Sequence, residues 1–321
     1  MIKEKIFVSI VIFFKLVEIQ TKVASVIPYM VGTAFALYKF ENFNTRQAVL
    51  LFLSMIIFDM TVTAINNYVD YSKAIKKEGF GYEEHNAITK YGLKPKTVLG
   101  IIIFMLMLSS ILGIILFLST NIIILLLGLI CFAIGIFYSF GPIPISRTPF
   151  GEIFSGVTMG FFITFLAVYI HIFDKGILNL SIVGNEFKFI INLEVIISIF
   201  IISIPLIVGI ANIMLANNIC DMEDDFINRR FTLPIYIGKE KALSVFKYLY
   251  YIGFISIVVG IIFKVLPIIS LLSLLVFIPI NKNIQLFNKL QSKKDTFILA
   301  VKNFILLNTT YIFTIILGII F

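Results

Sequence analysis

Long apolar runs alternate with short polar segments along this chain, and each run is long enough to cross a membrane as a helix. A hydrocarbon core of about 30 Å needs about 20 helical residues. Nine stretches meet this requirement: 22–39, 47–65, 97–118, 121–139, 151–172, 193–216, 244–263, 265–281 and 297–320. The pattern predicts an all-α fold, namely a polytopic membrane protein whose nine transmembrane helices form a single domain over residues 1–321.

The first 21 residues have a charged start and an apolar middle, as a signal peptide does. They contain no small-residue cleavage site, and Lys15 and Glu18 interrupt the apolar run. We therefore expect residues 1–20 to form an interfacial lead-in to the first span.

Composition and charge agree with a protein that lives in a lipid bilayer. Of the 321 residues, 60% are hydrophobic, and the mean hydropathy of +1.04 exceeds what a water-soluble core needs. Cysteine occurs only at Cys131 and Cys220, so no disulfide framework is expected.

The distribution of basic residues predicts the orientation, because Lys and Arg mark cytoplasmic loops. With the N-terminus and the loops 66–96, 140–150, 217–243 and 282–296 on one side, five of the 26 basic residues fall on the other side: Lys39, Arg46, Lys175, Lys188 and Lys264. We expect a plasma-membrane protein whose larger basic loops face the cytoplasm. The net charge of +8 then reflects topology and an anion site, and no nucleic-acid partner is expected.

Two short polar stretches are near-copies of each other, NNYVD at 66–70 and NNICD at 217–221. Each closes an apolar span, and the predicted order of spans makes the two helices point the same way. This arrangement predicts two four-helix pseudo-repeats, about 21–140 and 150–281, followed by a last helix at 297–320.

Each copy carries oxygen ligands on one helical face. Residues four apart share a face, so Asn66 projects with Asp70, and Asn217 projects with Asp221 and Asp225. Mg²⁺ commonly takes one or two carboxylates and completes its shell with water and substrate phosphate. We therefore expect these five residues to form a Mg²⁺ site.

Two guanidinium groups follow the second copy, at Arg229 and Arg230. Because guanidinium groups bind phosphate oxygens in a fork geometry, their position beside the carboxylates predicts a site for a diphosphate bridged by Mg²⁺.

Two other interpretations stay open from these residues alone. The acidic residues can be ordinary loop residues beside membrane spans, which is the simpler view of Glu78, Glu83, Glu84 and Glu223. A cation-coupled transporter also has carboxylates near helix breaks, but it has them near the bilayer midplane. The midplane of these spans is nearly free of ionisable side chains.

The two copies, together with YSFGPIPISRTPFGE at 138–152, resemble motifs of the UbiA-type intramembrane prenyltransferases. The closest resemblance is to the 1,4-dihydroxy-2-naphthoate prenyltransferases of menaquinone synthesis, and it extends from about residue 15 to the C-terminus. The family pattern NNIRDxEEDxxxGKRTL is matched at Asn217, Asn218, Ile219, Asp221, Glu223, Asp225, Thr232 and Leu233. The pattern NDYxDY is matched at Asn66, Tyr68, Asp70 and Tyr71, and Y-[ST]-x-G-P-x-P at Tyr138, Ser139, Gly141, Pro142 and Pro144.

Several positions depart from the family patterns. Asn67 stands in place of Asp, Ala74 stands where many members carry a third acidic residue, and Arg229 and Phe231 replace the usual Gly and Arg. The distribution of the diphosphate oxygens among Arg229, Arg230 and the nearby lysines is therefore left open.

The resemblance implies Mg²⁺-dependent transfer of a polyprenyl group from polyprenyl diphosphate to an aromatic acid. The residues implied as catalytic, through the metal, are Asn66, Asp70, Asp221 and Asp225. Neutralising the leaving group lets the allylic C–O bond break. In the naphthoate branch the attacked ring carbon loses its carboxylate as CO₂, which gives demethylmenaquinone. Acceptors such as 4-hydroxybenzoate or haem remain alternatives.

Further substrate contacts are expected around the motifs, at Tyr68, Lys73, Tyr138, Arg147, Asn217, Asn218, Arg229 and Arg230. Lys22 is a lone cation in the first span, and it either binds the acceptor carboxylate or is a snorkelling lysine. His85 has no ligand partner at a useful spacing and His171 is expected to face outward, so neither is expected to bind metal.

Overall fold

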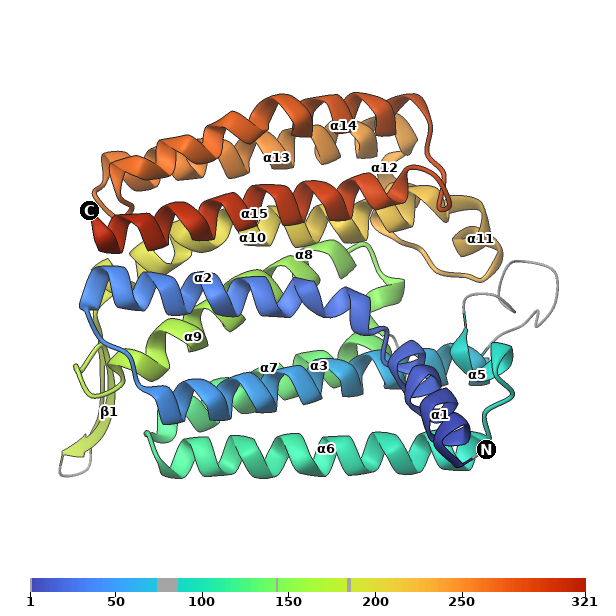
Figure 1. Cartoon of the computed structure of the whole chain (residues 1–321), viewed down its shortest axis with the longest axis horizontal. Coiled ribbons are helices and arrows are strands. Elements are labelled where there is room, and N and C mark those ends of the chain that lie inside the picture. Colours follow the sequence, from blue (N-terminus) through green and yellow to red (C-terminus); the bar gives the residue numbers. More distant parts are fainter. Residues whose placement is uncertain (1, 74–85, 143, 184–185) are drawn as a thin grey trace.

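The computed structural model describes residues 2–73, 86–142, 144–183 and 186–321. Within these residues, nine helical segments are long and apolar enough to cross a membrane, and they run side by side in one bundle (Figure 1). The expected fold class is therefore confirmed, and each predicted span corresponds to one of these segments with small shifts at the ends.

The spans are formed by α2 (Val23–Phe40), α3 (Thr45–Lys73), α6 (Pro95–Leu118), α7 (Ile122–Ser139), α8 and α9 (Gly151–Ser155 and Ile163–Ile172), α10 (Leu193–Cys220), α13 (Lys239–Ile262), α14 (Phe277–Lys289) and α15 (Phe297–Ile320). A π-helical segment, Gly156–Phe162, joins α8 to α9, and a 3₁₀ segment, Ile268–Val276, leads into α14. Short helices lie outside the spans: α1 (Ile2–Leu16), α5 (Ala87–Lys90), α11 (Met222–Ile227) and α12 (Leu233–Ile237).

Local sequence explains where several spans begin. The side chains of Asn121 and Asn192 accept hydrogen bonds from the free backbone N–H groups of Ile123 and Val195, and so they cap α7 and α10. Pro95 opens α6, at a helix position where a missing N–H costs little.

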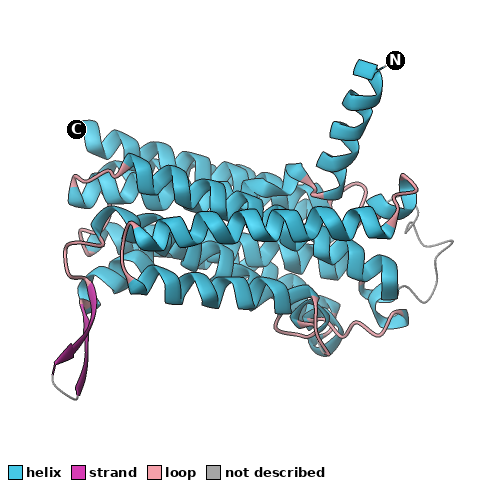
Figure 2. Ribbon diagram, turned by 90° about the horizontal axis from the view of Figure 1, so that it is seen from below, coloured by secondary structure: helices cyan, strands magenta, loops and turns pink. Residues whose placement is uncertain are grey.

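Two elements project from the bundle. Helix α1 leaves it at a steep angle (Figure 2), and its interfacial position stays a prediction. The strands β1 (Leu178–Val183) and β2 (Glu186–Ile191) form an antiparallel hairpin between the fifth and sixth spans. The hairpin is an addition to the purely helical prediction, and it lies at the end of the bundle opposite to α5 and α11.

Helix α10 is the central element of the second half of the chain. It packs most extensively against α13, the π-helical segment and α15. Gly156 and Gly160 make the contact with the π-helical segment possible, because a Cβ atom at Gly160 would lie 2.6 Å from Cα of Ile207. This packing fixes the C-terminal end of α10, where the second polar motif lies.

Within the first half α3 packs against α6, and α2 packs against α9 of the second half. Helices α3 and α10 both end where α5 and α11 lie, and this end is called the motif end below. The expectation that both motifs share one end of the molecule is met. The duplication of a four-helix unit stays a prediction.

Candidate active site

A single cavity of about 1530 Å³ receives side chains from both halves of the chain. At the motif end its lining is polar and charged, with Asn66, Asp70, Arg147, Asn217, Asp221, Asp224, Asp225, Arg230 and Lys293. Elsewhere it is mainly apolar, with residues such as Leu51, Phe58, Phe132, Leu166, Ile210, Ile213 and Met214. The cavity therefore combines a charged and polar end with an apolar interior.

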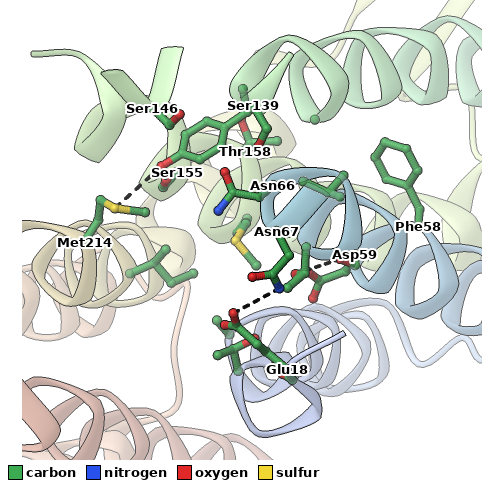
Figure 3. A pocket seen from close by; sticks show the side chains of 18 of the residues that line it. Glu18, Phe58, Asp59, Asn66, Asn67, Ser139, Ser146, Ser155, Thr158 and Met214 are labelled. Atoms are coloured by element: carbon green, nitrogen blue, oxygen red, sulfur yellow. Dashed lines mark hydrogen bonds between the residues drawn. The ribbon is translucent and has the colours of Figure 1, made fainter. Parts of the chain in front are cut away.

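The first motif contributes a polar stripe along α3. Asp59, Thr63, Asn66 and Asp70 are separated by four, three and four residues, so they share one helical face, and all four line the cavity. Figure 3 shows Asp59 and Asn66 projecting from this helix. Seven helical residues separate these two, about 10 Å along the axis.

The second motif contributes Asn217 and Asp221 from the end of α10, and Asp225 from α11. The helical path continues from α10 into α11, where the N–H of Asp225 donates to the carbonyl oxygen of Asp221 at 2.8 Å. As a result, Asp225 lies one turn beyond Asp221 and also lines the cavity.

The second amide of each motif has a structural contact. Asn67 donates to the carbonyl of Leu16 at 3.0 Å and to Glu18 at 3.3 Å, whereas Asn218 donates to Oε1 of Glu152 at 2.8 Å. Asn218 is only 2% exposed and is not part of the cavity lining. The structure therefore does not bring Asn218 to the position expected of a substrate ligand.

Each motif carboxylate expected to bind metal, Asp70, Asp221 and Asp225, has a basic partner. Arg147 lies 3.6 Å from Asp70, and Nε of Arg230 lies 3.3 Å from Asp225. Asp221 forms an ion pair with Lys293, from the segment between α14 and α15. These three cations converge on the rim of the cavity from three separate parts of the chain.

Asp225 is the most deeply buried of these carboxylates, at 4% exposed. Burial raises its pKa to about 6, and the neighbouring Arg230 partly opposes that rise. A carboxyl group with this pKa changes its charge between about pH 5 and pH 7.

The donor set fits a hard divalent cation. Carboxylate and amide oxygens of Asn66, Asp70, Asn217, Asp221 and Asp225 all reach the same cavity, and such oxygens are the ligands that Mg²⁺ prefers. Within the described ranges, no three His, Cys, Asp or Glu side chains converge on one point. A cation here would therefore have to complete its shell with water and with phosphate oxygens of a substrate.

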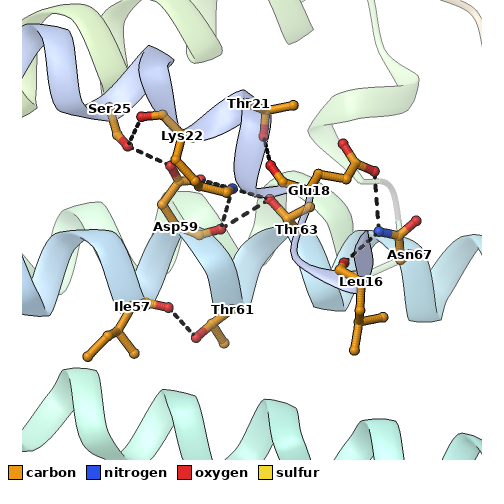
Figure 4. Close-up of polar contacts among 10 residues, drawn as sticks. All are labelled: Leu16, Glu18, Thr21, Lys22, Ser25, Ile57, Asp59, Thr61, Thr63 and Asn67. Atoms are coloured by element: carbon orange, nitrogen blue, oxygen red, sulfur yellow. Dashed lines mark hydrogen bonds and ion pairs between the residues drawn. The ribbon is translucent and has the colours of Figure 1, made fainter. Parts of the chain in front are cut away.

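Lys22 differs from both expectations. Its side chain is 4% exposed and is not part of the cavity lining, and its ammonium group donates to Oδ1 of Asp59 at 2.7 Å and to Thr63 at 2.6 Å (Figure 4). Ser25 donates to the second oxygen of Asp59 at 2.7 Å. Lys22 is thus neither snorkelling nor free to meet an acceptor. Asp59, in the middle of α3, is an ionisable group within a span, contrary to the expectation that the midplane is nearly free of such groups.

The remaining expected residues divide into two groups. Tyr138 lines the cavity, and its hydroxyl accepts from Ser155 at 2.9 Å and donates to the sulfur of Met214 at 3.6 Å. Tyr68 packs in a small apolar cluster at the base of α1, and Arg229 is exposed, so neither is part of the lining.

Three expectations concern other positions. The side chain of Lys73 and the whole of His85 lie outside the described residues. His171 is fully buried, accepts from the N–H of Asn44 at 2.9 Å and stacks on Phe43, so the expectation that it faces outward is wrong.

Asp59 and Lys293 are among the charged residues of the cavity that sequence reasoning did not assign to the site. Asp59 carries a detectable signal, because a single carboxylate within a long apolar span is costly unless it is used or paired. Lys293 has none, since it belongs to an ordinary basic loop and reaches Asp221 only through the fold.

Comparison with known proteins assigns this chain to a family. The model of the UbiA prenyltransferase family matches residues 25–308. The chain belongs to this family, and it is a prenyltransferase embedded in a membrane.

Individual relatives agree with this assignment. The chain is 31% identical to a 1,4-dihydroxy-2-naphthoate octaprenyltransferase from Bacillus subtilis (strain 168) over 254 residues, which are 77% of this chain and 72% of that protein. An apo UbiA homolog from Aeropyrum pernix K1 shares the fold, with a TM-score of 0.69, 16% identity and coverage of 92% and 98%. A UbiA homolog from Archaeoglobus fulgidus bound to DMAPP and Mg²⁺ also shares it, with a TM-score of 0.62, 17% identity and coverage of 95% and 98%.

Proposed function

We propose that this protein transfers a polyprenyl group from polyprenyl diphosphate to 1,4-dihydroxy-2-naphthoate, with loss of CO₂, to give the quinol form of demethylmenaquinone. The observation that carries the proposal is the shared cavity, with both Asn/Asp motifs at its polar end and an apolar lining beyond them. Supporting it, the curated relative with 31% identity has this acceptor in its name.

The polar end would hold the diphosphate. Asn66 and Asp70 on one side, and Asn217, Asp221 and Asp225 on the other, are the residues that would hold Mg²⁺. Bound there, Mg²⁺ would neutralise the negative charge that develops on the diphosphate as it leaves. Arg147 and Arg230, which already reach this rim, would bind the remaining phosphate oxygens through charge-assisted hydrogen bonds.

The apolar part of the cavity would hold the isoprenoid tail, because burying methyl and methylene groups away from water is favourable by about 25 cal/mol per Å². The bond between the first prenyl carbon and the diphosphate oxygen would break, and its electron pair would leave with the diphosphate. The ring carbon bearing the carboxylate would form the new C–C bond. CO₂ would then depart and return its electron pair to the ring.

We further propose that the motif end faces the cytoplasm of a plasma membrane. The proposal is supported by the excess of Lys and Arg in the loops at this end. Both substrates would then reach the cavity from the inner leaflet and the cytoplasm.

The proposed acceptor can be tested with purified protein, Mg²⁺, a labelled prenyl diphosphate and a panel of aromatic acids. Mass analysis of the lipid-soluble product should show a prenylated and decarboxylated naphthoquinol. A preference for 4-hydroxybenzoate, with its carboxylate retained, would contradict the proposed acceptor and leave the prenyl-transfer activity intact.

A further inference from the structure

Lys293 reaches the second motif from a distant part of the chain. It lies in the short segment between α14 and α15, and its ammonium group donates to Oδ1 of Asn217 and to Oδ2 of Asp221. These partners are 76 and 72 residues away in the sequence. They share one face of α10, because they are four residues apart.

The ammonium group of Lys293 lies where a metal cation would bind in the second motif. Asn217 and Asp221 are two of the oxygen ligands proposed for Mg²⁺, and Lys293 donates to an oxygen of each. A divalent cation bound at the same two oxygens would compete with the ammonium hydrogen bonds and repel its charge. A cation can therefore occupy this place only if Nζ of Lys293 moves away.

The loop that carries Lys293 lets the side chain move while its backbone stays fixed. The hydroxyl of Thr296 donates to the carbonyl of Leu290 at 2.8 Å and accepts from the N–H of Ser292 at 2.9 Å. The side chain of Lys293 itself is 37% exposed. A lysine has a flexible four-carbon stem, so its charge can shift without a change in the loop.

We infer that Lys293 is a place-holding cation that leaves Asn217 and Asp221 when a divalent cation binds there, and then binds the substrate diphosphate. Arg147 and Arg230 are paired in the same way with Asp70 and Asp225 at the same rim, so a displaced Lys293 would join two cations already directed at the anionic head. The inference rests on the proposed function, and it adds the segment between α14 and α15 to the parts of the chain that recognise the diphosphate.

A purely structural ion pair would tie α14 and α15 to α10 and nothing more. The two roles differ in how the charge of Lys293 affects cation affinity. If Lys293 is a place-holder, its removal abolishes a competitor and divalent cations bind more tightly. If Lys293 only stabilises the fold, its removal leaves cation affinity unchanged or lowers it.

The test measures Mn²⁺ binding to detergent-solubilised protein by electron paramagnetic resonance, with no substrate present. Lys293→Met should bind Mn²⁺ about two- to fivefold more tightly than the wild type, which corresponds to loss of a partly exposed ion pair. Lys294→Met is the matched control, because it removes the same charge from the next residue. Lys294 is exposed and has no recorded hydrogen bond or ion pair within the described residues, so its removal should leave Mn²⁺ affinity almost unchanged.

The second arm measures inorganic pyrophosphate binding at saturating Mn²⁺. Lys293→Met should weaken it about tenfold, as expected for a lost charge-assisted hydrogen bond, while Lys293→Arg retains most of the affinity. If Lys293→Met does not fold, Lys293→Gln serves the same comparison.

Unchanged or weaker Mn²⁺ binding by the neutral variant would overturn the place-holding role, and unchanged pyrophosphate binding would overturn the role toward diphosphate. Either result could occur in a protein that still transfers prenyl groups. Failure of the inference is therefore distinguishable from failure of the proposed function.

Discussion

At the residue scale, neighbouring asparagines within each motif have different contacts. Asn66, Asn67 and Asn217 line the cavity, and Asn67 and Asn218 donate to acidic side chains at the entry to the first and fifth spans, Glu18 and Glu152. The first amide of each motif thus faces the cavity, and the second one holds the helix end in place. Substitution at the two kinds of position should have different consequences.

The first prediction concerns the metal motif. Asp70→Asn and Asp221→Asn should each lower kcat roughly a hundredfold, because each removes a charge that would hold the cation beside the leaving group. Both variants should still insert and fold. Glu223→Gln is a suitable control, since Glu223 is exposed and outside the cavity lining. Near-normal turnover of an Asp variant at saturating Mg²⁺ would remove that residue from the site.

The second prediction concerns Lys22 and Asp59. Lys22→Met leaves the partly buried carboxylate of Asp59 without its cation, which should destabilise the protein by about 1–3 kcal/mol. The thermal midpoint in detergent should fall, and the double variant Lys22→Met/Asp59→Leu should recover part of the loss. KM for the aromatic acid and KM for the prenyl diphosphate should change to a similar degree. A selective rise in KM for the aromatic acid would restore the acceptor-binding role.

At the scale of elements, α11 is the piece that completes the second motif. It begins directly after Asp221, and it buries Asp225 beside Arg230 and the hydroxyl of Thr232. Burial raises the pKa of Asp225 to about 6. The charge state of this short helix should therefore depend on pH within an accessible range.

The third prediction follows from that pKa. Because the pKa of Asp225 is raised in the folded state, its contribution to stability without divalent cation is present below about pH 4 and is lost as the pH rises through 6. A cation needs the ionised form, so the rise in thermal midpoint caused by Mg²⁺ should be larger at pH 7.5 than at pH 5. Asp225→Asn should lose most of this difference. An equal Mg²⁺ effect at both pH values would contradict the assignment to Asp225.

At the scale of the whole molecule, the bundle has two unlike ends. The motif end carries α5, α11 and the basic rim of the cavity, and the opposite end carries the hairpin of β1 and β2. The orientation of this asymmetric bundle determines which compartment supplies the soluble acceptor.

The fourth prediction concerns that orientation. In a variant without Cys131 and Cys220, a cysteine at position 228, at the motif end, should resist an impermeant thiol reagent applied to intact cells. A cysteine at position 174, near the hairpin, should react readily. The reverse pattern would contradict a cytoplasmic motif end. Both Asn228→Cys and Asp174→Cys should react after the membrane is permeabilised.

Much of this architecture follows from local sequence. The spans were predictable because a bilayer requires continuous apolar helices, and the position of Asn66 and Asp70 on one cavity face followed from helical spacing. The partners of buried groups were not predictable. Lys22 meets Asp59 and Lys293 meets Asp221 only after helices distant in sequence have packed, and neither pairing leaves a periodic pattern. The hairpin between the fifth and sixth spans was also missed.

The central claim, that this cavity transfers a prenyl group to the naphthoate, is tested most directly by the stoichiometry of products from purified protein in lipid. With Mg²⁺, prenyl diphosphate and 1,4-dihydroxy-2-naphthoate, the account predicts equal amounts of diphosphate, CO₂ and prenylated naphthoquinol, and roughly a hundredfold lower initial rate of formation of all three with Asp221→Asn. Release of diphosphate without a prenylated product, or a product formed equally by the Asp221 variant, would contradict it.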